Sequence, residues 1–408
     1  MPTCKNTLLT IVCFLTLQFT DNVFGTVYYV SKSGNDAFSY FAAQNKTSPK
    51  QTIAAGIRCL SAGDTLYIRE GIYNEAINEY RTKLPSGNSW QTAVTIAGYP
   101  GEKVIIQPNA SESEVLRLMG SSGGTRYVIF DNLILDGANV TSNIVKITYT
   151  GNNPNNTAHH IRIQSCELKQ AKTNGIFVDS ESNHNEFISL KIHDNGTTDF
   201  DHGMYICGSN NLIEKCDIYR NAGWGIHIYT EHKPESANYN IVRRNNIHEN
   251  ARAENRGFGI IVSSGTGNSV YNNLIWGNNG GIQIDYHAVN TIIYNNTIWS
   301  NNRSKTHENG IKTGAGSTNA RIVNNISWNH IAGNISNAGI NTYLSNNLTD
   351  KSPLFVNSSK SDFRLQEKSP AINTGKNLAP LVTDDYNGIR RPQGSTYDIG
   401  AFEYKTYK

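Results

Sequence analysis

The sequence predicts an all-β fold, a single-domain parallel β-helix in which short strands stack coil upon coil. A unit of about 22 to 29 residues recurs between Arg126 and Ser345, a period typical of solenoids. Each unit contains runs of about four to six residues in which apolar and polar side chains alternate, as in strands with one buried face. Asparagine accounts for 52 of the 408 residues, which indicates that a repeated structural position uses it.

The first 25 residues have the composition of a secretory signal peptide. Lys5 precedes an apolar run of about 12 residues from Leu8 to Phe19, and cleavage is expected after Gly25. A membrane-spanning helix needs roughly 20 apolar residues, so we expect secretion and no membrane association of the mature chain. Because the net charge is only +3 and basic residues form no run, no nucleic-acid partner is expected.

The mature chain divides into three further segments. Residues 26–75 are expected to form an N-terminal strand and a cap helix at Gln51 to Leu60, since the first coil otherwise exposes its strand edges. Residues 76–345 form the coils. Residues 346–408 depart from the coil period and are expected to fold back as a C-terminal cap and tail.

Two columns of asparagine appear when the coils are aligned on their first strand. Two residues before the buried apolar position, the first column holds Cys166, Leu190, Cys216, Asn245, Asn273, Asn296 and Asn325. Three residues after that position, the second column holds Asn195, Asn221, Asn250, Asn278 and Asn301. Stacked amides about 4.8 Å apart can hydrogen-bond along the helix axis, so the sequence predicts two internal asparagine ladders.

The same alignment predicts free cysteines. Cys166 and Cys216 share a column two coils apart, about 9.6 Å, which exceeds the limit of about 7 Å for a disulfide. Cys207 falls on an outward position, and Cys59 lies in the N-terminal segment. We therefore expect buried thiols at the ladder positions and no disulfide.

About eleven N-x-S/T sequons occur, and they predict a glycoprotein wherever the asparagine is exposed. Asn195 and Asn325 lie in the predicted ladders, so these two are expected to be unmodified.

Three segments carry a resemblance to a known family. They are TVYYVSKSGND from Thr26, SPKQTIAAGIRCLSAGDTLYIREGIYNE from Ser48, and DDYNGIRRPQGSTYDIGAFEY from Asp384. With the repeated coil motif, they make the chain similar to the right-handed parallel β-helix proteins of the pectate-lyase-like superfamily. The resemblance implies a right-handed helix over nearly the whole mature chain. It leaves the activity open, because the superfamily includes lyases, hydrolases, epimerases and non-catalytic adhesins.

The second strand type of each coil begins at a glycine and displays two outward columns. The second place after the glycine holds Phe177, Tyr205, His227, Ile261, Gln283, Lys312 and Asn341. The fourth place holds Asp179, Cys207, Tyr229, Ser263, Asp285, Gly314 and Tyr343. Neighbours within a column are about 4.8 Å apart, so the columns form a rigid grid of side chains.

Titratable side chains are densest in two adjacent coils of this grid. The stretches DFDHGMYICGS and GWGIHIYTEH bring together His202, Tyr205, His227, Tyr229 and Glu231, with Asp199 and Asp201 at the preceding turn. Such a convergence is what a site for proton abstraction needs. The alternative is that these residues only cover the surface. The insertion after Tyr229 is expected to wall one side of a groove.

Two other groups are candidates for substrate binding. Asp285, His287 and Lys312 lie on consecutive coils, and Lys312 is about 14 Å from His227, so one long saccharide could contact both. As a base Lys312 would need a lowered pKa, and a solvated lysine is the alternative. Another face presents a ladder of tryptophans, which either stack against sugars or are covered by a loop: Trp276, Trp299 and Trp328.

We interpret the chain as a secreted, monomeric enzyme that acts on a polysaccharide, with an acidic glycan as the favoured substrate. β-Elimination on a uronate polymer needs a base, an acid and a group that neutralises the carboxylate, and His202, Tyr205, His227 and Tyr229 are the candidate acid and base. If calcium neutralises the substrate, Asp199 and Asp201 are its candidate ligands. Glycoside hydrolysis, C5-epimerisation and non-catalytic glycan binding are the alternatives.

Overall fold

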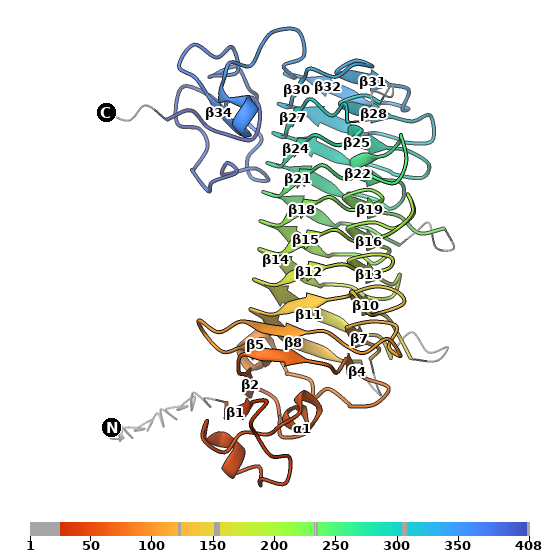
Figure 1. Cartoon of the computed structure of the whole chain (residues 1–408). Coiled ribbons are helices and arrows are strands. Elements are labelled where there is room, and N and C mark those ends of the chain that lie inside the picture. Colours follow the sequence, from red (N-terminus) through yellow and green to blue (C-terminus); the bar gives the residue numbers. More distant parts are fainter. Residues whose placement is uncertain are drawn as a thin grey trace, which may run out of the picture.

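A computed structural model describes residues 25–120, 124–150, 156–231, 233, 236–303 and 308–405 (Figure 1). Apart from Gly25, the predicted signal peptide lies outside the described residues. The described chain winds into one elongated solenoid that rises from its N-terminal segment to the last coil (Figure 1). None of the helices within these residues is long and apolar enough to cross a membrane.

Three parallel sheets run along the solenoid, and each complete coil passes through sheet A, then sheet B, then sheet C. Sheet A stacks β1 (Val27–Val30), β2 (Thr65–Ile68), β5 (Val94–Gly98), β8 (Arg126–Asp131), β11 (His159–Gln164), β14 (Glu186–Ile188), β17 (Leu212–Glu214), β20 (Ile241–Arg243), β23 (Ser269–Tyr271), β26 (Ile292–Tyr294), β29 (Arg321–Val323) and β32 (Tyr343–Ser345). Sheet B stacks β3 (Gly71–Tyr73), β6 (Val104–Ile106), β9 (Ile134–Asp136), β12 (Glu167–Lys169), β15 (Lys191–His193), β18 (Asp217–Tyr219), β21 (Asn246–His248), β24 (Leu274–Trp276), β27 (Thr297–Trp299) and β30 (Ile326–Trp328). Sheet C stacks β4 (Ile77–Asn78), β7 (Leu116–Leu118), β10 (Val145–Ile147), β13 (Ile176–Val178), β16 (Met204–Ile206), β19 (Ile226–Ile228), β22 (Phe258–Val262), β25 (Gly280–Ile284), β28 (Ile311–Thr313) and β31 (Ile335–Asn337).

The interior is filled by the inward side chains of these short strands. In β16, for example, Met204 and Ile206 are fully buried while Tyr205 between them is only half-buried. Between sheets A and B the chain turns at single residues in the left-handed conformation, such as Arg244 with φ 58° and Asn272 with φ 54°. This tight corner keeps the inward rows of successive coils aligned, so outward side chains recur at a fixed spacing.

Both predicted asparagine ladders are confirmed. In the first, the amide of Asn245 donates to Asn273 at 3.0 Å, and the same bond repeats through Asn296 and Asn325 to Asn347. In the second, the bonds run from Asn195 to Asn301 at matching positions of successive coils. The backbone N–H of Asn301 then donates to Nδ1 of His330 at 3.2 Å, so this ladder ends on a histidine.

A third ladder was not predicted. It runs at the corner between sheets C and A through Asn185, Asn211, Asn240 and Asn268, with side-chain bonds of 2.9 to 3.1 Å. All three ladders satisfy buried amide groups, since an unpaired buried polar group is costly. The sequons at Asn195 and Asn325 are buried as expected, and the sequon at Asn295 is buried too because its amide donates to the carbonyl of Asp398.

The four cysteines of the described residues are free and buried. The backbone N–H of Cys216 donates to Oδ1 of Asn245 at 2.9 Å, so this thiol holds a ladder position as predicted. Cys207 was predicted at an outward position, and it is only 8% exposed. The hydroxyl of Ser236 donates to the carbonyl of Cys207, so the loop after Tyr229 packs over it. Burial raises the pKa of Cys166, Cys207 and Cys216 to about 12.

The N-terminal cap helix is shorter than expected. It is α1 (Ile53–Ile57), with Thr52 as its N-cap and the carboxylate of Glu75 accepting from the N–H groups of Ile53 and Ala54. Two single 3-10 turns, at Ala42–Gln44 and Trp90–Thr92, complete this end of the chain. Gly56 packs against Val30 and Leu66, where a side chain would collide with the first coil.

Only the start of the C-terminal segment covers the end of the solenoid, where Leu348 pairs with Ile326 of β30, and the rest lies along the side. It contains the antiparallel pair β33 (Phe355–Asn357) and β34 (Asp362–Leu365), joined by a 3-10 turn at Ser358–Lys360. Figure 1 shows β34 beside the strands of sheet B. The side chains of corner residues donate to tail carbonyls on successive coils: Asn272 to Asp384, Asn295 to Asp398 and Asn324 to Lys376.

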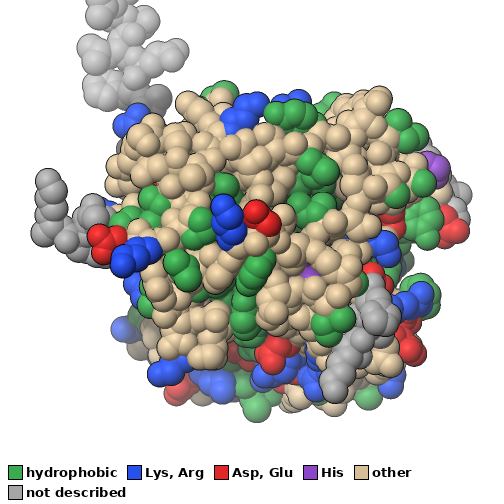
Figure 2. All heavy atoms as spheres, turned by 90° about the horizontal axis from the view of Figure 1, so that it is seen from above, with side chains coloured by type: hydrophobic (Ala, Val, Ile, Leu, Met, Phe, Trp, Pro, Cys, Tyr) green, Lys and Arg blue, Asp and Glu red, His purple; other side chains and the backbone are tan. Residues whose placement is uncertain are grey.

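The last coil therefore keeps an open end over sheets A and C. Ile340 and Leu344 at this end are 53% and 42% exposed. Figure 2 views the molecule from above and shows hydrophobic side chains at the surface of this end. The strand edges of β31 and β32 have no further coil to pair with in the described chain.

Candidate functional site

A cleft of about 540 Å³ opens over sheet C. Its floor consists of outward side chains of β16, β19, β22, β25 and β28. One wall comes from the turns that connect sheet B to sheet C, and the other from residues that follow the strands of sheet C. The lining residues include seven that the sequence predicted, namely His202, Tyr205, His227, Tyr229, Glu231, Asp285 and Lys312.

The register of sheet C explains why two predicted clusters share one cleft. Tyr205 pairs with His227, which is followed coil by coil by Ile261, Gln283 and Lys312. This is the predicted outward column. Its last member was wrong, because Lys312 pairs with Ser336 and not with the predicted Asn341. The glycine motif before Asn341 forms a turn in the structure, and sheet C ends earlier at β31.

His202 and His227 form a hydrogen-bonded pair at the base of the cleft. Nδ1 of His202 accepts from the backbone N–H of Trp224 at 3.1 Å. Nε2 of His202 lies 3.2 Å from Nδ1 of His227. Burial lowers the pKa of His202 to about 3, and burial together with the neighbouring His202 holds the pKa of His227 well below its usual range. Both rings are therefore neutral at physiological pH.

Three aromatic rings stand side by side across the cleft floor. The ring of Tyr205 stacks on His227 with centroids 5.0 Å apart, and His227 stacks on Tyr229 at 5.2 Å, with interplanar angles of 11° and 10°. Burial raises the pKa of both tyrosines. The site thus offers two protonated phenols and a neutral imidazole in one row, groups suited to moving protons or binding sugar oxygens.

Carboxyl groups occupy the far part of the cleft. Burial raises the pKa of Asp285, whose side chain accepts a hydrogen bond from Gln283. Its Oδ1 has no hydrogen-bond partner among the described residues. Lys312 is 40% exposed, and its Nζ lies 3.4 Å from a carboxylate oxygen of Glu308. Glu308 is a lining residue that sequence reasoning missed.

Other missed residues come from the walls. Arg256 forms an ion pair with Asp199, and its guanidinium lies 5.5 Å from the ring centroid of Phe200. Phe200 is 65% exposed beside the cleft, and Tyr286 lines the opposite wall. No signal in the sequence could have found Arg256, Phe200 and Tyr286, because the turns between strands vary in length and carry no period.

The geometry does not fit the predicted calcium ligands. Asp199 is engaged by Arg256. Oδ2 of Asp201 accepts from the backbone N–H groups of Thr197 and Thr198 at 2.9 and 2.7 Å, and from the hydroxyl of Thr198 at 2.9 Å. Among the described residues no group of three or more His, Cys, Asp or Glu side chains is placed to hold a metal ion. Asp201 holds the turn before His202, and Asp199 binds Arg256 of the cleft wall.

Two further predicted binding groups lie outside the cleft. His287 is exposed on the turn after β25 and is not among the lining residues, where Tyr286 takes its place. The tryptophan ladder is correctly aligned on sheet B but lies under the C-terminal tail. Trp276 and Trp299 pack against Phe363 at 6.1 and 5.6 Å between centroids, so they anchor the tail and are not a sugar platform. Trp328 packs against a second cluster that includes Leu365 and Ile399.

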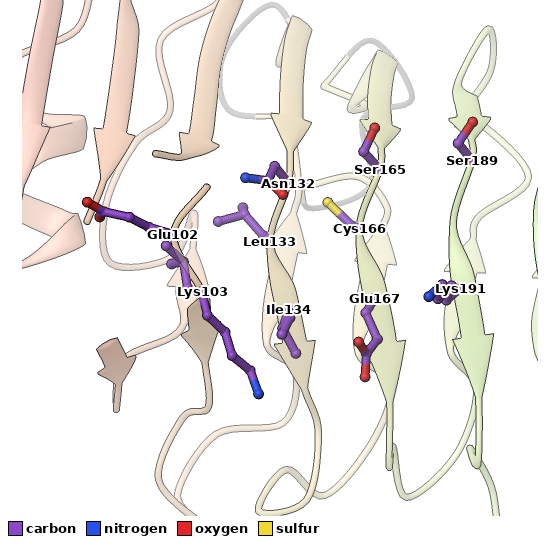
Figure 3. A pocket seen from close by; sticks show the side chains of 11 residues that line it. Glu102, Lys103, Asn132, Leu133, Ile134, Ser165, Cys166, Glu167, Ser189 and Lys191 are labelled. Carbon is purple, nitrogen blue, oxygen red and sulfur yellow. The ribbon is translucent and has the colours of Figure 1, made fainter. Parts of the chain in front are cut away.

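A smaller hollow of about 290 Å³ lies over the start of sheet B. Its lining includes Lys103, Glu167 and Lys191 from three different coils (Figure 3). None of the side chains labelled in Figure 3 carries a ring, and the lining contains no histidine or tyrosine. The cleft over sheet C is therefore the better candidate for chemistry.

Comparisons with known proteins agree with this architecture. A family described as a right handed beta helix region matches residues 174–349. No curated protein matches the sequence. Among solved structures, pectate lyase Pel9A superposes with a TM-score of 0.65 at 15% identity, over 94% of this chain and 98% of that one.

Two more solved structures have the same fold. XylC in complex with xylose gives a TM-score of 0.58 at 12% identity, over 93% of this chain and 99% of that one. GH136 lacto-N-biosidase from Eubacterium ramulus gives 0.53 at 12% identity, over 79% of this chain and 67% of that one. At such identities the likeness concerns the fold alone. The chain is a right-handed parallel β-helix that shares the fold of pectate lyase Pel9A.

Proposed function

We propose that the chain is a polysaccharide lyase that cleaves a uronic-acid-containing polymer by β-elimination in the cleft over sheet C. The observation that carries this proposal is the row of Tyr205, His227 and Tyr229, stacked at the cleft floor and backed by His202. A group of uncharged proton-bearing side chains on the floor of a cleft that spans five coils suits a bond inside a long polymer.

The reaction needs three groups. A base removes the proton at C5 of the uronate, the bond between C4 and the glycosidic oxygen breaks as the C4–C5 double bond forms, and an acid returns a proton to the leaving oxygen. A third group must neutralise the carboxylate so that the C5 proton becomes acidic. The two phenols and the imidazole supply proton-transfer groups. Lys312, three coils along the same column, supplies a cation for a neighbouring carboxylate.

The test is a screen of pectate, alginate, glucuronan and glycosaminoglycans for absorbance near 235 nm, which the unsaturated product of elimination produces. We expect one polymer to give the signal and Tyr205→Phe to abolish it. Tyr219→Phe is the matched control, because Tyr219 stacks between His193 and His248 on sheet B, away from the cleft. Equal loss in both variants, or full activity in Tyr205→Phe, would refute the assignment.

Glycoside hydrolysis is a second candidate because the cleft also holds carboxyl groups. Asp285 has a raised pKa, as a general acid needs, and Glu231 and Glu308 line the same cleft. A hydrolase requires two such groups about 5 to 9.5 Å apart. New reducing ends without absorbance near 235 nm, lost in Asp285→Asn but not in Tyr205→Phe, would favour hydrolysis over elimination.

We also propose that the chain is secreted as a monomer with Thr26 as its first residue, because the leading segment has signal-peptide composition. Expression in a secreting host, followed by N-terminal sequencing and size determination of the product, tests this proposal. Retention inside the cell with an intact N-terminus would contradict it.

A further inference from the structure

We infer that His202 is a positioning residue that fixes the tautomer of His227, so that His227 presents an N–H donor to the cleft and is not the base. This inference deepens the proposed function and rests on it for its catalytic meaning, while the tautomer itself can be observed without substrate.

The direction of the hydrogen bonds starts at a backbone amide. The N–H of Trp224 can only donate, and it lies 3.1 Å from Nδ1 of His202. Nδ1 of His202 must therefore hold a lone pair. The ring is held in place, because it stacks on Trp224 with centroids 4.6 Å apart and its own backbone N–H donates to Oδ1 of Asn174 at 2.7 Å. His202 is only 2% exposed, so water does not compete for these contacts.

The same reasoning fixes which nitrogen of the second ring, His227, carries the proton. A neutral imidazole carries one N–H, so His202 carries it on Nε2 and donates to Nδ1 of His227 at 3.2 Å. His227, also neutral, must then carry its own N–H on Nε2. The depressed pKa values of both rings agree with this state. The titratable groups around the pair are Asp201 beside His202, and Tyr205 and Tyr229, whose rings lie next to His227.

The N–H on Nε2 of His227 faces substrate space. His227 lines the cleft, and none of the described residues provides an acceptor for its Nε2. An acceptor has to come from a bound ligand, such as a carboxylate or glycosidic oxygen of the polymer. A neutral imidazole that donates in this way stabilises charge that develops on oxygen. The proton acceptor at C5 must then be another group of the cleft, because Nε2 of His227 has no free lone pair.

The decisive measurement is the tautomer of His227 in protein labelled with 15N-histidine. Long-range 1H–15N correlation spectra distinguish a proton on Nδ1 from one on Nε2, and His227→Gln identifies the signals. We expect the Nε2–H form of His227 between pH 5 and pH 8. The Nδ1–H form, or a charged ring at pH 7, would overturn the inference whether or not any polymer is cleaved.

Two substitutions at His202 form a matched pair. In His202→Gln the amide can accept from Trp224 and still donate to His227, so the Nε2–H tautomer is retained. In His202→Glu an ionised carboxylate can only accept, so the proton of His227 moves to Nδ1. An unchanged tautomer in His202→Glu, or a switch in His202→Gln, would contradict the role of His202. The spectrum of the unmodified chain decides the matter even where a variant fails to fold.

Activity supplies a second readout once a substrate is known. Loss of one preorganised donor typically lowers kcat about 10²- to 10³-fold. We expect His202→Glu to lose kcat on this scale with a smaller change in KM, and His202→Gln to recover most of it. Equal losses of kcat in both variants would show that His202 contributes only to packing. If the tautomers are as expected but no polymer is cleaved, the proposed function fails and the positioning role stands.

Discussion

The residue at a ladder position decides whether the ladder of hydrogen bonds continues into the next coil or ends there. Asn250 shows what such a position does. Its Oδ1 accepts from the amide of Asn221 at 2.9 Å, and its Nδ2 donates to Asn278 at 3.1 Å and to the carbonyl of Ile218 at 2.9 Å. Every polar atom of this buried amide is engaged, so one side chain links three coils.

Asn250→Ala should therefore be strongly destabilising. The substitution removes the acceptor of the backbone N–H and the side-chain amide of Asn221 and a donor to the Ile218 carbonyl, at about 1–3 kcal/mol for each buried group left unpaired. We expect the free energy of unfolding to fall by about 3 kcal/mol or more, measured by urea denaturation. Asn109→Ala is the control because Asn109 is exposed, and it should change the free energy by less than about 0.5 kcal/mol. Similar values for the two variants would contradict a structural role for the ladder.

The protonation states of the cleft residues predict the pH dependence of elimination. The pKa values of His202 and His227 lie well below 6.5, and those of Tyr205 and Tyr229 are raised. The histidines do not change charge near neutrality, while the phenolate fraction grows with pH. We expect kcat/KM to rise between pH 7 and pH 10 without an inflection near 6.5. A rising limb with a midpoint near 6.5 would show that a histidine titrates in catalysis.

At the scale of elements, the period of the sequence was sufficient to align sheet B, and sheet C as far as Lys312. Alternation and spacing placed Tyr205, His227 and Lys312 in one column and aligned the tryptophans of sheet B. Elements without a period could not be placed in this way. The turns that carry Phe200 and Arg256 differ in length from coil to coil. The tail has no repeat that would reveal which face it covers.

The packing of the C-terminal tail on the tryptophans of sheet B can be tested by a substitution at Phe363. Phe363 is 1% exposed and packs on Trp276, Trp299 and Phe355, so Phe363→Ala opens a cavity beneath the tail. We expect a loss of about 3–5 kcal/mol and a red shift of tryptophan fluorescence as the indole rings meet water. Phe41→Ala, at an 83% exposed position, is the control. An unshifted spectrum in Phe363→Ala would mean that the tail does not shield the tryptophans.

The molecule as a whole carries buried histidines that oppose folding in acid. The pKa of His202 is lowered to about 3 and that of His330 to about 4, both by burial, against about 6.5 in an unfolded chain. Below pH 6.5 the unfolded chain therefore binds protons that the folded chain does not. Each histidine costs about 1.4 kcal/mol of stability for every pH unit as the pH falls from 6.5 toward its folded pKa.

His330→Asn isolates one of these contributions. His330 ends the second ladder, accepting from the N–H of Asn301 and bonding the carbonyl of Ile298, and an asparagine makes the same two bonds elsewhere in that column. We expect the variant to fold and to lose less stability between pH 6.5 and pH 4 than the unmodified chain, as measured by urea denaturation across that range. Parallel stability curves for the two proteins would contradict this account.

The position of the tail along the solenoid changes how the molecule should open. In a stack of coils each repeat touches only its neighbours, so such proteins can unzip one repeat at a time from an open end. Here the corner residues Arg244, Asn272, Asn295 and Asn324 bind the tail on successive coils. The tail thus ties non-adjacent repeats together, and those repeats include the coils of Ile261, Gln283 and Lys312. Fraying that starts at the exposed end around Ile340 should stop at this tie, so the part of the cleft beside it opens as one cooperative unit.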